Sequence, residues 1–486
     1  MDLTYITYSI ALLFFLFATY VRRGHKTIPV PPGPRSWRFS GVVHLISKHH
    51  PWISFARWSE KYGPIMSFRV YNQTIVVLNS AKAIHDLLDK RAALYSDRPR
   101  SWMLHDLCGR RDTVFNIPAT NGRHRKYRSL IQTGLNQRAT LSYAPVLEKE
   151  LAVLLQRLKN APESYQEHIR RNAAAVIMRV AYGYSVTEEN DFFVRTAEEA
   201  SQISGLAMAP GRWLVNYFPL LRFVPSWFPG AGFHRQATIW RKELNALSGI
   251  PHQWLRDQMA AGTDNDCFTT RLLKPSGGKA VSADEEDIIK WAAGGLYAGA
   301  ADTTFSALTS FVLLMAVHPD IQDHARSEII EIVGADRSPC VGDLSRFVYL
   351  AAVLKEVLRI APVAPLAMPH QVIQEDEYDG YTIPKHATVM ANVWSIMHDE
   401  EIYHEPLVFD PTRFISSKSG SSVQLDPRTY SFGFGRRTCP GSYFAETSML
   451  LIMAGILSQF KISLPHKETA TPGRVRALEY TSGITR

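Results

Sequence analysis

The stretch SFGFGRRTCPG, residues 431–441, is the most informative part of this 486-residue chain. Five of its residues follow the pattern F-x-x-G-x-R-x-C-x-G, namely Phe432, Gly435, Arg437, Cys439 and Gly441. At ordinary residue frequencies such a combination should arise by chance about once in several million starting points. Glycine allows a backbone to bend tightly and to approach a flat ligand closely. We therefore expect a bent loop that presents Cys439 to a ligand.

A helix is predicted directly after this loop. Pro440 suits the first turn of a helix, and SYFAETSMLLIMAGIL (442–457) continues as an apolar helical run. This places Cys439 at a helix N-terminus beside Arg436 and Arg437, where the helix dipole and both cations favour the thiolate over the thiol. A thiolate held in such a loop is the fifth ligand that a haem iron requires.

Two other interpretations of Cys439 are weaker. A structural zinc site needs about four ligands, commonly from paired C-x-x-C units, and Cys108, Cys267 and Cys340 offer no such pairs. A lone cysteine is often a small buried hydrophobic residue, but the rarity of the motif argues against that interpretation. Four cysteines without apparent pairs also indicate a reducing compartment rather than a disulfide framework.

The cysteine loop resembles the haem-binding signature of the cytochrome P450 family, and the motifs described below extend this resemblance over nearly the whole chain. The resemblance implies a mainly α-helical fold with small β-sheets that encloses a b-type haem. It also implies that Cys439 binds the iron, that Arg437 contacts a haem propionate, and that Phe432, Gly435 and Gly441 shape the cofactor loop.

Composition agrees with a large folded domain. Apolar residues make up 46% of the chain and charged residues 20%, so a substantial core is available and disorder is not expected. The formal net charge is +9, but the basic residues are scattered among acids without a long Lys/Arg run, which argues against nucleic-acid binding. The excess fits an anionic membrane surface, an acidic protein partner and the carboxylates of a cofactor.

The N-terminus predicts a membrane anchor. Residues 3–21 contain no charge and just span a bilayer core, and basic residues follow at once. The positive-inside rule then places the downstream chain in the cytosol. A cleaved signal peptide is the alternative. It would need basic residues before the apolar run and a cleavage site of small residues after it, and neither is present. We expect a single-pass anchor in the endoplasmic reticulum membrane at residues 1–28, and a catalytic domain at residues 29–486. That domain should begin with a stiff proline-rich spacer, IPVPPGPR (28–35).

A basic helix is predicted within NGRHRKYRSLIQTGL (121–135), after a β-hairpin predicted at residues 62–80. His124 and Arg128 lie four residues apart, on one helical face. The family usually has Trp-x-x-x-Arg here, so the resemblance assigns a propionate contact to Arg128 and, in place of the Trp, to His124. The alternative is a solvated basic face.

One long central helix is predicted at residues 285–318, which contain no proline. Its small residues Gly294, Gly295 and Gly299 should let a planar cofactor lie against the backbone. Asp302 and Thr303 place polar groups in an apolar stretch and resemble the oxygen-activation motif of the family, although Ala300 stands at its customary glycine. The alternative is a satisfied helix interior, with threonine bonding back to the preceding turn.

A buried charge network is predicted behind the cysteine loop. Glu356 and Arg359 lie on one face of an apolar helix, so they must be satisfied locally or by a third partner. The resemblance supplies Arg413, in a segment where Thr412 replaces the usual glutamate of the family. It also places His370 where a propionate donor is expected.

Two further segments carry predictions. Residues 213–230 combine six aromatic residues with three prolines and suit a membrane interface better than a regular core helix, although a buried loop is nearly as compatible. By resemblance this region lies over the substrate entrance. Residues 477–486 are expected to form a hairpin turn over the substrate cavity, without the short strand that follows it in relatives.

The resemblance implies a monooxygenase that inserts one oxygen atom into a medium-sized apolar metabolite, as in fungal secondary metabolism. Asp302 and Thr303 would organise protons, and electrons would come from an NADPH-dependent reductase, with cytochrome b5 as a second donor. The cations expected to face the reductase are Arg123, Arg125, Lys126, Arg436 and Arg437. Two alternatives stay open, namely a reductase-independent haem-thiolate isomerase or dehydratase, and a non-catalytic haem-binding protein.

Overall fold

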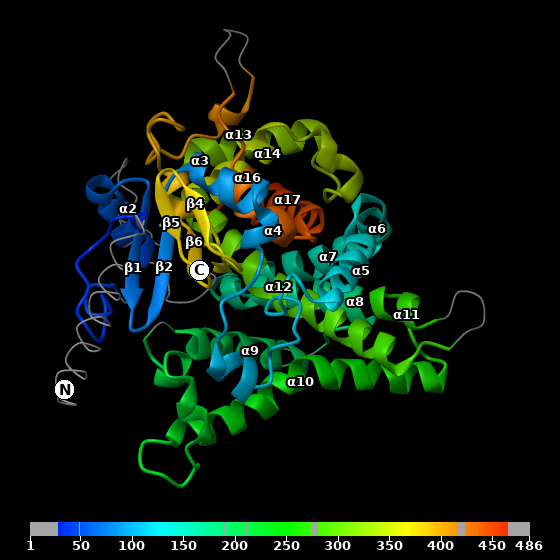
Figure 1. The fold of residues 1–486 in the computed structure, drawn as a ribbon. Coiled ribbons are helices and arrows are strands. Elements are labelled where there is room, and N and C mark those ends of the chain that lie inside the picture. The colour runs from blue at the N-terminus through cyan, green and yellow to red at the C-terminus, as the bar shows by residue number, and fades with distance from the viewer. Residues whose placement is uncertain are drawn as a thin grey trace, which may run out of the picture.

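The computed structural model describes residues 28–464, except for residues 48, 188–190, 210, 275–279 and 417–422. The predicted membrane segment at residues 3–21 and the predicted hairpin at residues 477–486 therefore lie outside the described residues. In the described part, helices form most of the molecule and the strands gather on one side of it (Figure 1). This is the mainly helical fold with small sheets that the sequence predicts.

The helices divide by length. The longer α-helices are α2 (Pro51–Tyr62), α5 (Gly122–Leu135), α7 (Ala144–Asn160), α8 (Tyr165–Tyr182), α9 (Phe192–Met208), α10 (Gly232–Ala261), α12 (Ala283–Val317), α13 (Pro319–Val333), α14 (Tyr349–Ile360) and α17 (Ser442–Gln459). The shorter α-helices are α3 (Ala81–Ile84), α4 (Ala92–Tyr95), α6 (Gln137–Ser142), α11 (Phe268–Leu273), α15 (Val393–Met397) and α16 (Arg428–Ser431). Single π- or 3₁₀-turns connect them, namely η1 (His85–Lys90), η2 (Trp102–Leu107), η3 (Pro162–Ser164), η4 (Leu214–Asn216), η5 (Pro219–Phe223), η6 (Val341–Arg346), η7 (Pro411–Phe414) and η8 (Gly435–Arg437).

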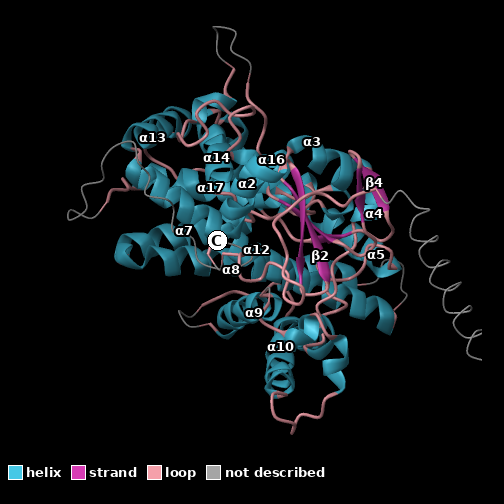
Figure 2. Cartoon of the chain, turned by 60° about the vertical axis from the view of Figure 1, so that its left-hand side comes forward, coloured by secondary structure: helices cyan, strands magenta, loops and turns pink. Residues whose placement is uncertain are grey.

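Two small sheets lie beside the helices (Figure 2). The larger one has the order β1-β2-β6-β3, with strands β1 (Ile65–Val70), β2 (Gln73–Leu78), β6 (Thr388–Ala391) and β3 (His370–Gln371). The smaller one pairs β4 (Asp376–Tyr378) with β5 (Tyr381–Ile383). Strands β1 and β2 are antiparallel, with Val70 opposite Gln73, which confirms the predicted hairpin.

Helix α12 is the central helix of the bundle, and it contacts α8, α5, α10, α9 and α17. Its start is fixed by a capping box, because Ser282 Oγ accepts from the Glu285 backbone N–H at 3.3 Å and Glu285 Oε2 accepts from the Ser282 backbone N–H at 3.1 Å. Among the described residues, α12 is the one helix that is long and apolar enough to cross a membrane. Helix α12 is apolar because neighbouring helices on several sides bury it in the core.

The proline-rich segment forms no helix or strand, and from residue 29 on it is docked on the globular domain rather than free. The Ser67 backbone N–H of β1 donates to Pro32 O at 2.8 Å, and the Thr382 N–H of β5 donates to Pro29 O at 2.9 Å. Pro31 and Pro34 are buried. From residue 29 on, the segment therefore packs on the sheet region.

Candidate active site

The cysteine loop is bent at two glycines in the left-handed region. Gly433 has φ +76° and Gly435 has φ +50°, which most L-residues adopt only with strain. The Cys439 backbone N–H donates to Phe432 O at 2.6 Å and closes the bend. Helix α17 starts at Ser442, so Pro440 lies before the helix and not in its first turn, which corrects the predicted boundary.

The environment of the Cys439 thiol differs from the predicted one. The side chain is accessible, yet the surrounding protein raises its pKa by desolvation. The Gly441 N–H and the Arg128 guanidinium oppose that rise, whereas the sequence assigned the stabilising charge to Arg436 and Arg437. Arg437 instead points into the protein, where it donates to Ser96 O at 2.8 Å and Ile117 O at 2.5 Å. Coordination to a metal ion would remove the thiol proton outright.

A group of basic residues surrounds the loop. Its members are Arg98, His124, Arg128, His370 and Arg437, and we call them the basic cluster. His124, His370 and Arg437 are buried, and Arg98 and Arg128 are half-buried. Burial lowers the pKa of Arg98 to about 9 and that of Arg437 to about 10. Among the described residues, no carboxylate forms an ion pair with Arg98, Arg128 or Arg437. Buried charges are normally paired, so the cluster has the chemistry of an anion site.

The two histidines of the basic cluster are neutral at pH 7. Burial, followed by the charges of Arg437, Arg128 and Arg98, lowers the pKa of His124 to about 3. Burial also lowers the pKa of His370 to about 3. His370 Nδ1 lies 2.7 Å from Tyr95 O and must donate to it, because a carbonyl only accepts. In this neutral tautomer Nε2 is an acceptor, so His370 would donate to a propionate only as an imidazolium.

Asp302 and Thr303 are half-buried in the middle of α12. The Thr303 hydroxyl donates to Gly299 O at 2.8 Å, which is the bond to the preceding turn that the sequence left as an alternative. That bond uses the hydroxyl proton but leaves the oxygen lone pairs free to accept. The helix is continuous through Ala300, the residue that replaces the usual glycine of the motif.

Three glycines of α12 that we expected beside a planar cofactor are contacted by side chains of other segments. A Cβ at Gly294 would lie 2.7 Å from Ser248 Cβ, and one at Gly295 would lie 2.7 Å from Val114 Cγ2. A Cβ at Gly299 would lie 3.2 Å from the ring of Phe115. These glycines therefore admit side chains from α10 and from the loop before α5.

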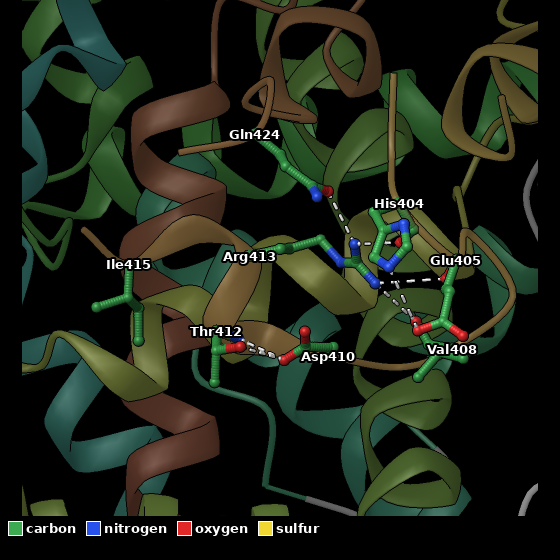
Figure 3. Close-up of a pocket in the computed structure, with 8 residues that line it drawn as sticks. All are labelled: His404, Glu405, Val408, Asp410, Thr412, Arg413, Ile415 and Gln424. Atoms are coloured by element: carbon green, nitrogen blue, oxygen red, sulfur yellow. Dashed lines mark hydrogen bonds and ion pairs between the residues drawn. The ribbon is translucent and has the colours of Figure 1, made fainter. Parts of the chain in front are cut away.

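The predicted charge network is fully buried and directly bonded. Arg359 donates to both Glu356 oxygens at 2.7 Å, and Arg413 Nε donates to Glu356 Oε1 at 3.2 Å. Arg413 also reaches His404 O and Gln424 Oε1, both at 2.8 Å, beside a surface pocket of about 210 Å³ (Figure 3). Every guanidinium arm of this network thus has an acceptor.

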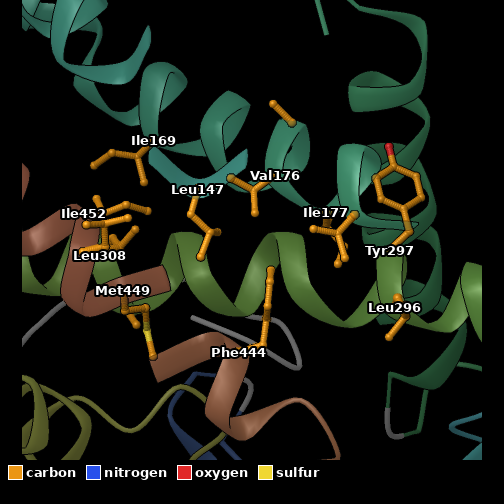
Figure 4. Close-up of a cluster of buried hydrophobic side chains, with 14 of the residues drawn as sticks. Leu147, Ile169, Val176, Ile177, Leu296, Tyr297, Leu308, Phe444, Met449 and Ile452 are labelled. Carbon is orange, nitrogen blue, oxygen red and sulfur yellow. The ribbon is translucent and has the colours of Figure 1, made fainter. Parts of the chain in front are cut away.

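An apolar cluster fixes α12 relative to the helix that follows the cysteine loop. Helices α7, α8, α12 and α17 contribute side chains that interlock in Figure 4, including Leu147, Ile169, Val176, Ile177, Leu296, Tyr297, Leu308, Phe444, Met449 and Ile452. Phe444, five residues after Cys439, is buried in this cluster. The packing therefore holds the cysteine loop and α12 in one rigid arrangement.

Sequence reasoning missed two residues of the site. Arg98 donates to Met368 O at 2.8 Å and Pro369 O at 2.7 Å, and its charge lowers the pKa of His370. Phe115 accepts from Arg98 Nε through its backbone carbonyl at 3.2 Å and packs against Gly299. Arg98 stands in the basic stretch DRPR (97–100), which looks like an exposed turn until the fold buries it.

The residues present fit a cysteine-ligated haem. The accessible thiol of Cys439 offers an iron ligand, and the arginines of the basic cluster offer partners for carboxylates. These two features lie together, because Arg128 both donates to Thr438 O at 2.6 Å and acts on the Cys439 thiol.

Comparison with known proteins identifies the family. The family model for cytochrome P450 matches residues 31–475. Cytochrome P450 monooxygenase claR of Ampulloclitocybe clavipes is 36% identical over 95% of this chain and 84% of its own length. Cytochrome P450 monooxygenase 208 of Postia placenta is 36% identical over 98% and 91%, and cytochrome P450 monooxygenase ppsD of Aspergillus oryzae is 33% identical over 95% and 88%. With matches that run through both the cysteine loop and the central helix, the chain belongs to the cytochrome P450 family.

Proposed function

We propose that the protein inserts one oxygen atom from dioxygen into a medium-sized apolar metabolite of fungal secondary metabolism, using b-type haem and electrons from an NADPH-dependent reductase. As a cytochrome P450 monooxygenase it uses a cysteine-ligated haem, a redox partner and an apolar substrate. The observation that carries the proposal is an accessible Cys439 thiol beside arginines that form no ion pair with a carboxylate in the described part of the chain. A reductase-independent isomerase or dehydratase is not favoured, because these relatives are named monooxygenases.

Each residue of the site has a role in this proposal. Bound haem supplies the binding and reduction of dioxygen. Cys439 Sγ would be its iron ligand, and Arg98, Arg128 and Arg437 would bind its carboxylates. Thr303 Oγ1 would accept a hydrogen bond from a proton donor, because the bond to Gly299 O leaves its lone pairs free. The Asp302 carboxyl would resupply that proton.

Spectroscopy tests the iron ligand. The ferrous protein with carbon monoxide should show the red-shifted Soret band of a thiolate-ligated haem, and Cys439→Ser should lose it. Cys340→Ser is the matched control, because this thiol lies beside Asp343 and Arg337 and outside the site. A thiolate band that survives in Cys439→Ser would reject the ligand assignment.

Coupling of electrons to product tests the proton role. Thr303→Ala should still bind haem and accept electrons, but product per NADPH should fall about a hundredfold and hydrogen peroxide should rise. Thr304→Ala is the control, since this buried side chain is rotated by about 100° around the helix. Preserved coupling in Thr303→Ala, or a larger defect in Thr304→Ala, would contradict the assignment.

The surface proposed for the reductase needs one revision. Arg123 donates to Asp287 at 2.7 Å and to Asp284 at 2.6 Å, so it ties α5 to the start of α12 instead of facing a partner. Arg125, Lys126 and Arg436 are exposed, and Lys126 lies 4.0 Å from Asp284. Within the described residues, Arg125 and Arg436 are therefore the cations of this face without an ion pair, and Lys126 is partly compensated.

Charge reversal tests this partner surface. Arg125→Glu combined with Arg436→Glu should slow reduction by NADPH-cytochrome P450 reductase about tenfold at low ionic strength, and salt should reduce the difference. Cytochrome b5, which we propose as a second donor, should be affected in the same direction. Lys385→Glu is the control, because this exposed residue follows β5 and belongs neither to α5 nor to the cysteine loop. Unchanged reduction kinetics would reject this surface.

A membrane contact is proposed at residues 213–230, with the single-pass anchor and the endoplasmic reticulum location resting on residues 1–28. Leu220, Phe223 and Trp227 are exposed by 79%, 68% and 77%, in a segment of short 3₁₀-turns without a regular helix. Large exposed apolar side chains in one segment suit a lipid interface. Removing residues 1–26 should leave partial binding to vesicles in flotation, and Phe223→Ser with Trp227→Ser should remove the remainder. Complete loss after truncation alone would reject the second contact.

A further inference from the structure

The π-helical turn η1 lies directly against the loop that carries Cys439. A Cβ at Gly435 would overlap Leu88 O of η1 and would lie 2.7 Å from Ala92 Cβ at the start of α4, so the loop backbone touches the turn without an intervening side chain. π-Turns are rare and frequently occur at functional sites. At this contact backbone meets backbone, and a side chain at position 435 would not fit.

Asp89 makes the polar part of this contact. Its Oδ1 accepts from the Gly435 backbone N–H at 2.8 Å. Gly435 begins η8, whose N-cap residue Phe434 has no side-chain cap, so the carboxylate supplies an acceptor that the loop lacks. Hydrogen bonds to an ionised carboxylate are shorter and stronger than neutral ones.

The bond continues from Gly435 to the residue before the cysteine. Thr438 Oγ1 donates to Gly435 O at 2.9 Å, and the Thr438 N–H donates to the same oxygen at 3.3 Å. Arg128 then holds Thr438 O at 2.6 Å. Asp89 thus holds Gly435 through its N–H, Gly435 holds Thr438 through its carbonyl, and Arg128 holds the peptide that joins Thr438 to Cys439.

We propose that Asp89 is a positioning residue for the haem thiolate, which fixes the cysteine loop through the Gly435 peptide. The inference rests on the proposed role of Cys439 as the iron ligand. Its neighbour Asp86 has a different function, because it bonds Lys82 at 2.8 Å, Lys90 at 2.9 Å and Tyr378 Oη at 2.8 Å, away from the loop. The same turn therefore offers a matched pair of carboxylates. The partner on the outer side of Asp89 is His85, at 3.4 Å.

The test follows the thiolate band of the ferrous carbon monoxide complex with time, in the haem-loaded full chain. Each variant is incubated at one fixed interval below its own melting temperature, so that differences in global stability are removed. Asp89→Ala should lose the thiolate band about tenfold faster than wild type, as expected when one charge-assisted bond is removed. Asp89→Asn keeps an acceptor oxygen and should lose the band only about twofold to threefold faster. Asp86→Asn should melt earlier but lose the band at the wild-type rate.

The outcomes separate the two proposals. A wild-type protein without a thiolate band would reject the ligand role of Cys439. A normal wild-type band with equal decay in Asp89→Ala and Asp86→Asn would reject the positioning role of Asp89. If Asp89→Ala fails to fold, Asp89→Asn is compared with Asp86→Asn instead. Equal decay of the thiolate band in these two variants would also reject the positioning role of Asp89.

Discussion

Two groups of arginines in this molecule follow opposite rules. Around Glu356, the guanidinium groups of Arg359 and Arg413 meet a carboxylate at 2.7–3.2 Å, and backbone carbonyls take the remaining arms. Beside Cys439, Arg437 is buried and Arg98 is half-buried, and both donate to backbone carbonyls alone among the described residues. The first group has a directly bonded carboxylate, whereas in the second Asp97 acts on Arg437 only at a distance, without an ion pair.

This difference separates a group of charges that stabilises the fold from one that is available to bind a ligand. A buried charge without a counter-ion is costly, so a fold keeps one where an external group supplies the counter-ion. The network at Glu356 is complete in the polypeptide and has nothing left to bind. The basic cluster is incomplete in the polypeptide, and a dicarboxylate such as haem would complete it.

Removal of the anion should have the largest effect. Glu356→Ala leaves Arg359 and Arg413 buried without a counter-charge, so we expect a loss of about 3–5 kcal/mol in the free energy of unfolding. Soluble yield and thermal unfolding measure this effect. Glu446→Gln, which breaks the surface pair with Arg428 at 2.8 Å, should cost less than about 1 kcal/mol. Similar losses in the two variants would contradict the distinction.

The second-largest effect is expected from acid, which should destabilise the folded protein through the histidines of the basic cluster. The pKa of His124 is lowered to about 3 in the folded protein, against about 6.5 in the unfolded chain. Between these values the unfolded chain binds more protons, so the free energy of unfolding should fall as pH decreases below 6.5, by up to about 1.4 kcal/mol per pH unit. Denaturant titrations of haem-depleted protein should show a shallower fall in His124→Gln. An identical slope would mean that His124 is already charged in the folded protein.

Loss of one cation from the basic cluster should weaken cofactor binding rather than folding. Arg128→Leu removes a positive charge and the bond to Thr438 O. Haem transfer to apomyoglobin should therefore accelerate about tenfold, which corresponds to about 1.4 kcal/mol in the activation free energy of haem release. The free energy of unfolding of the haem-depleted protein should change by less than about 1 kcal/mol. A large loss of stability in that form would place Arg128 with the structural group.

The smallest effect is expected where the sequence departs from the family motif. Thr412 is exposed, and its hydroxyl donates to Asp410 at 2.6 Å, while Arg413 is already satisfied by Glu356 and by carbonyls. Thr412→Glu should therefore change the free energy of unfolding by no more than about 0.5 kcal/mol. A clear stabilisation would show that the network has room for a second anion.

Sequence reasoning located the residues that carry chemistry by type and spacing. Glu356 and Arg359 stand out because two charges interrupt an apolar helix, and the bonds at 2.7 Å between them follow from spacing along one helical face. The long helix α12 is equally visible, because no proline interrupts it. Local patterns determine such features, so the sequence is sufficient for them.

Features that depend on packing between distant segments could not be predicted in this way. The glycines of α12 are visible as small residues, but Val114 and Phe115 occupy the space beside them, which only the fold reveals. Arg98 reads as part of a surface turn until the carbonyls of Met368 and Pro369 surround it. The partner of Arg123 was misjudged for the same reason, because its acceptors lie more than 160 positions away.

The bond between α5 and α12 through Arg123 has a mechanical consequence. Arg125 and Lys126, which we propose to meet the reductase, lie on the same helical turn as Arg123, whose guanidinium holds Asp284 and Asp287 in and near the first turn of α12. Because both carboxylates hold this guanidinium, α5 is fixed to the start of α12 rather than free to shift along it. The face that we propose for the reductase therefore keeps one position relative to the helix that carries Asp302 and Thr303 further along.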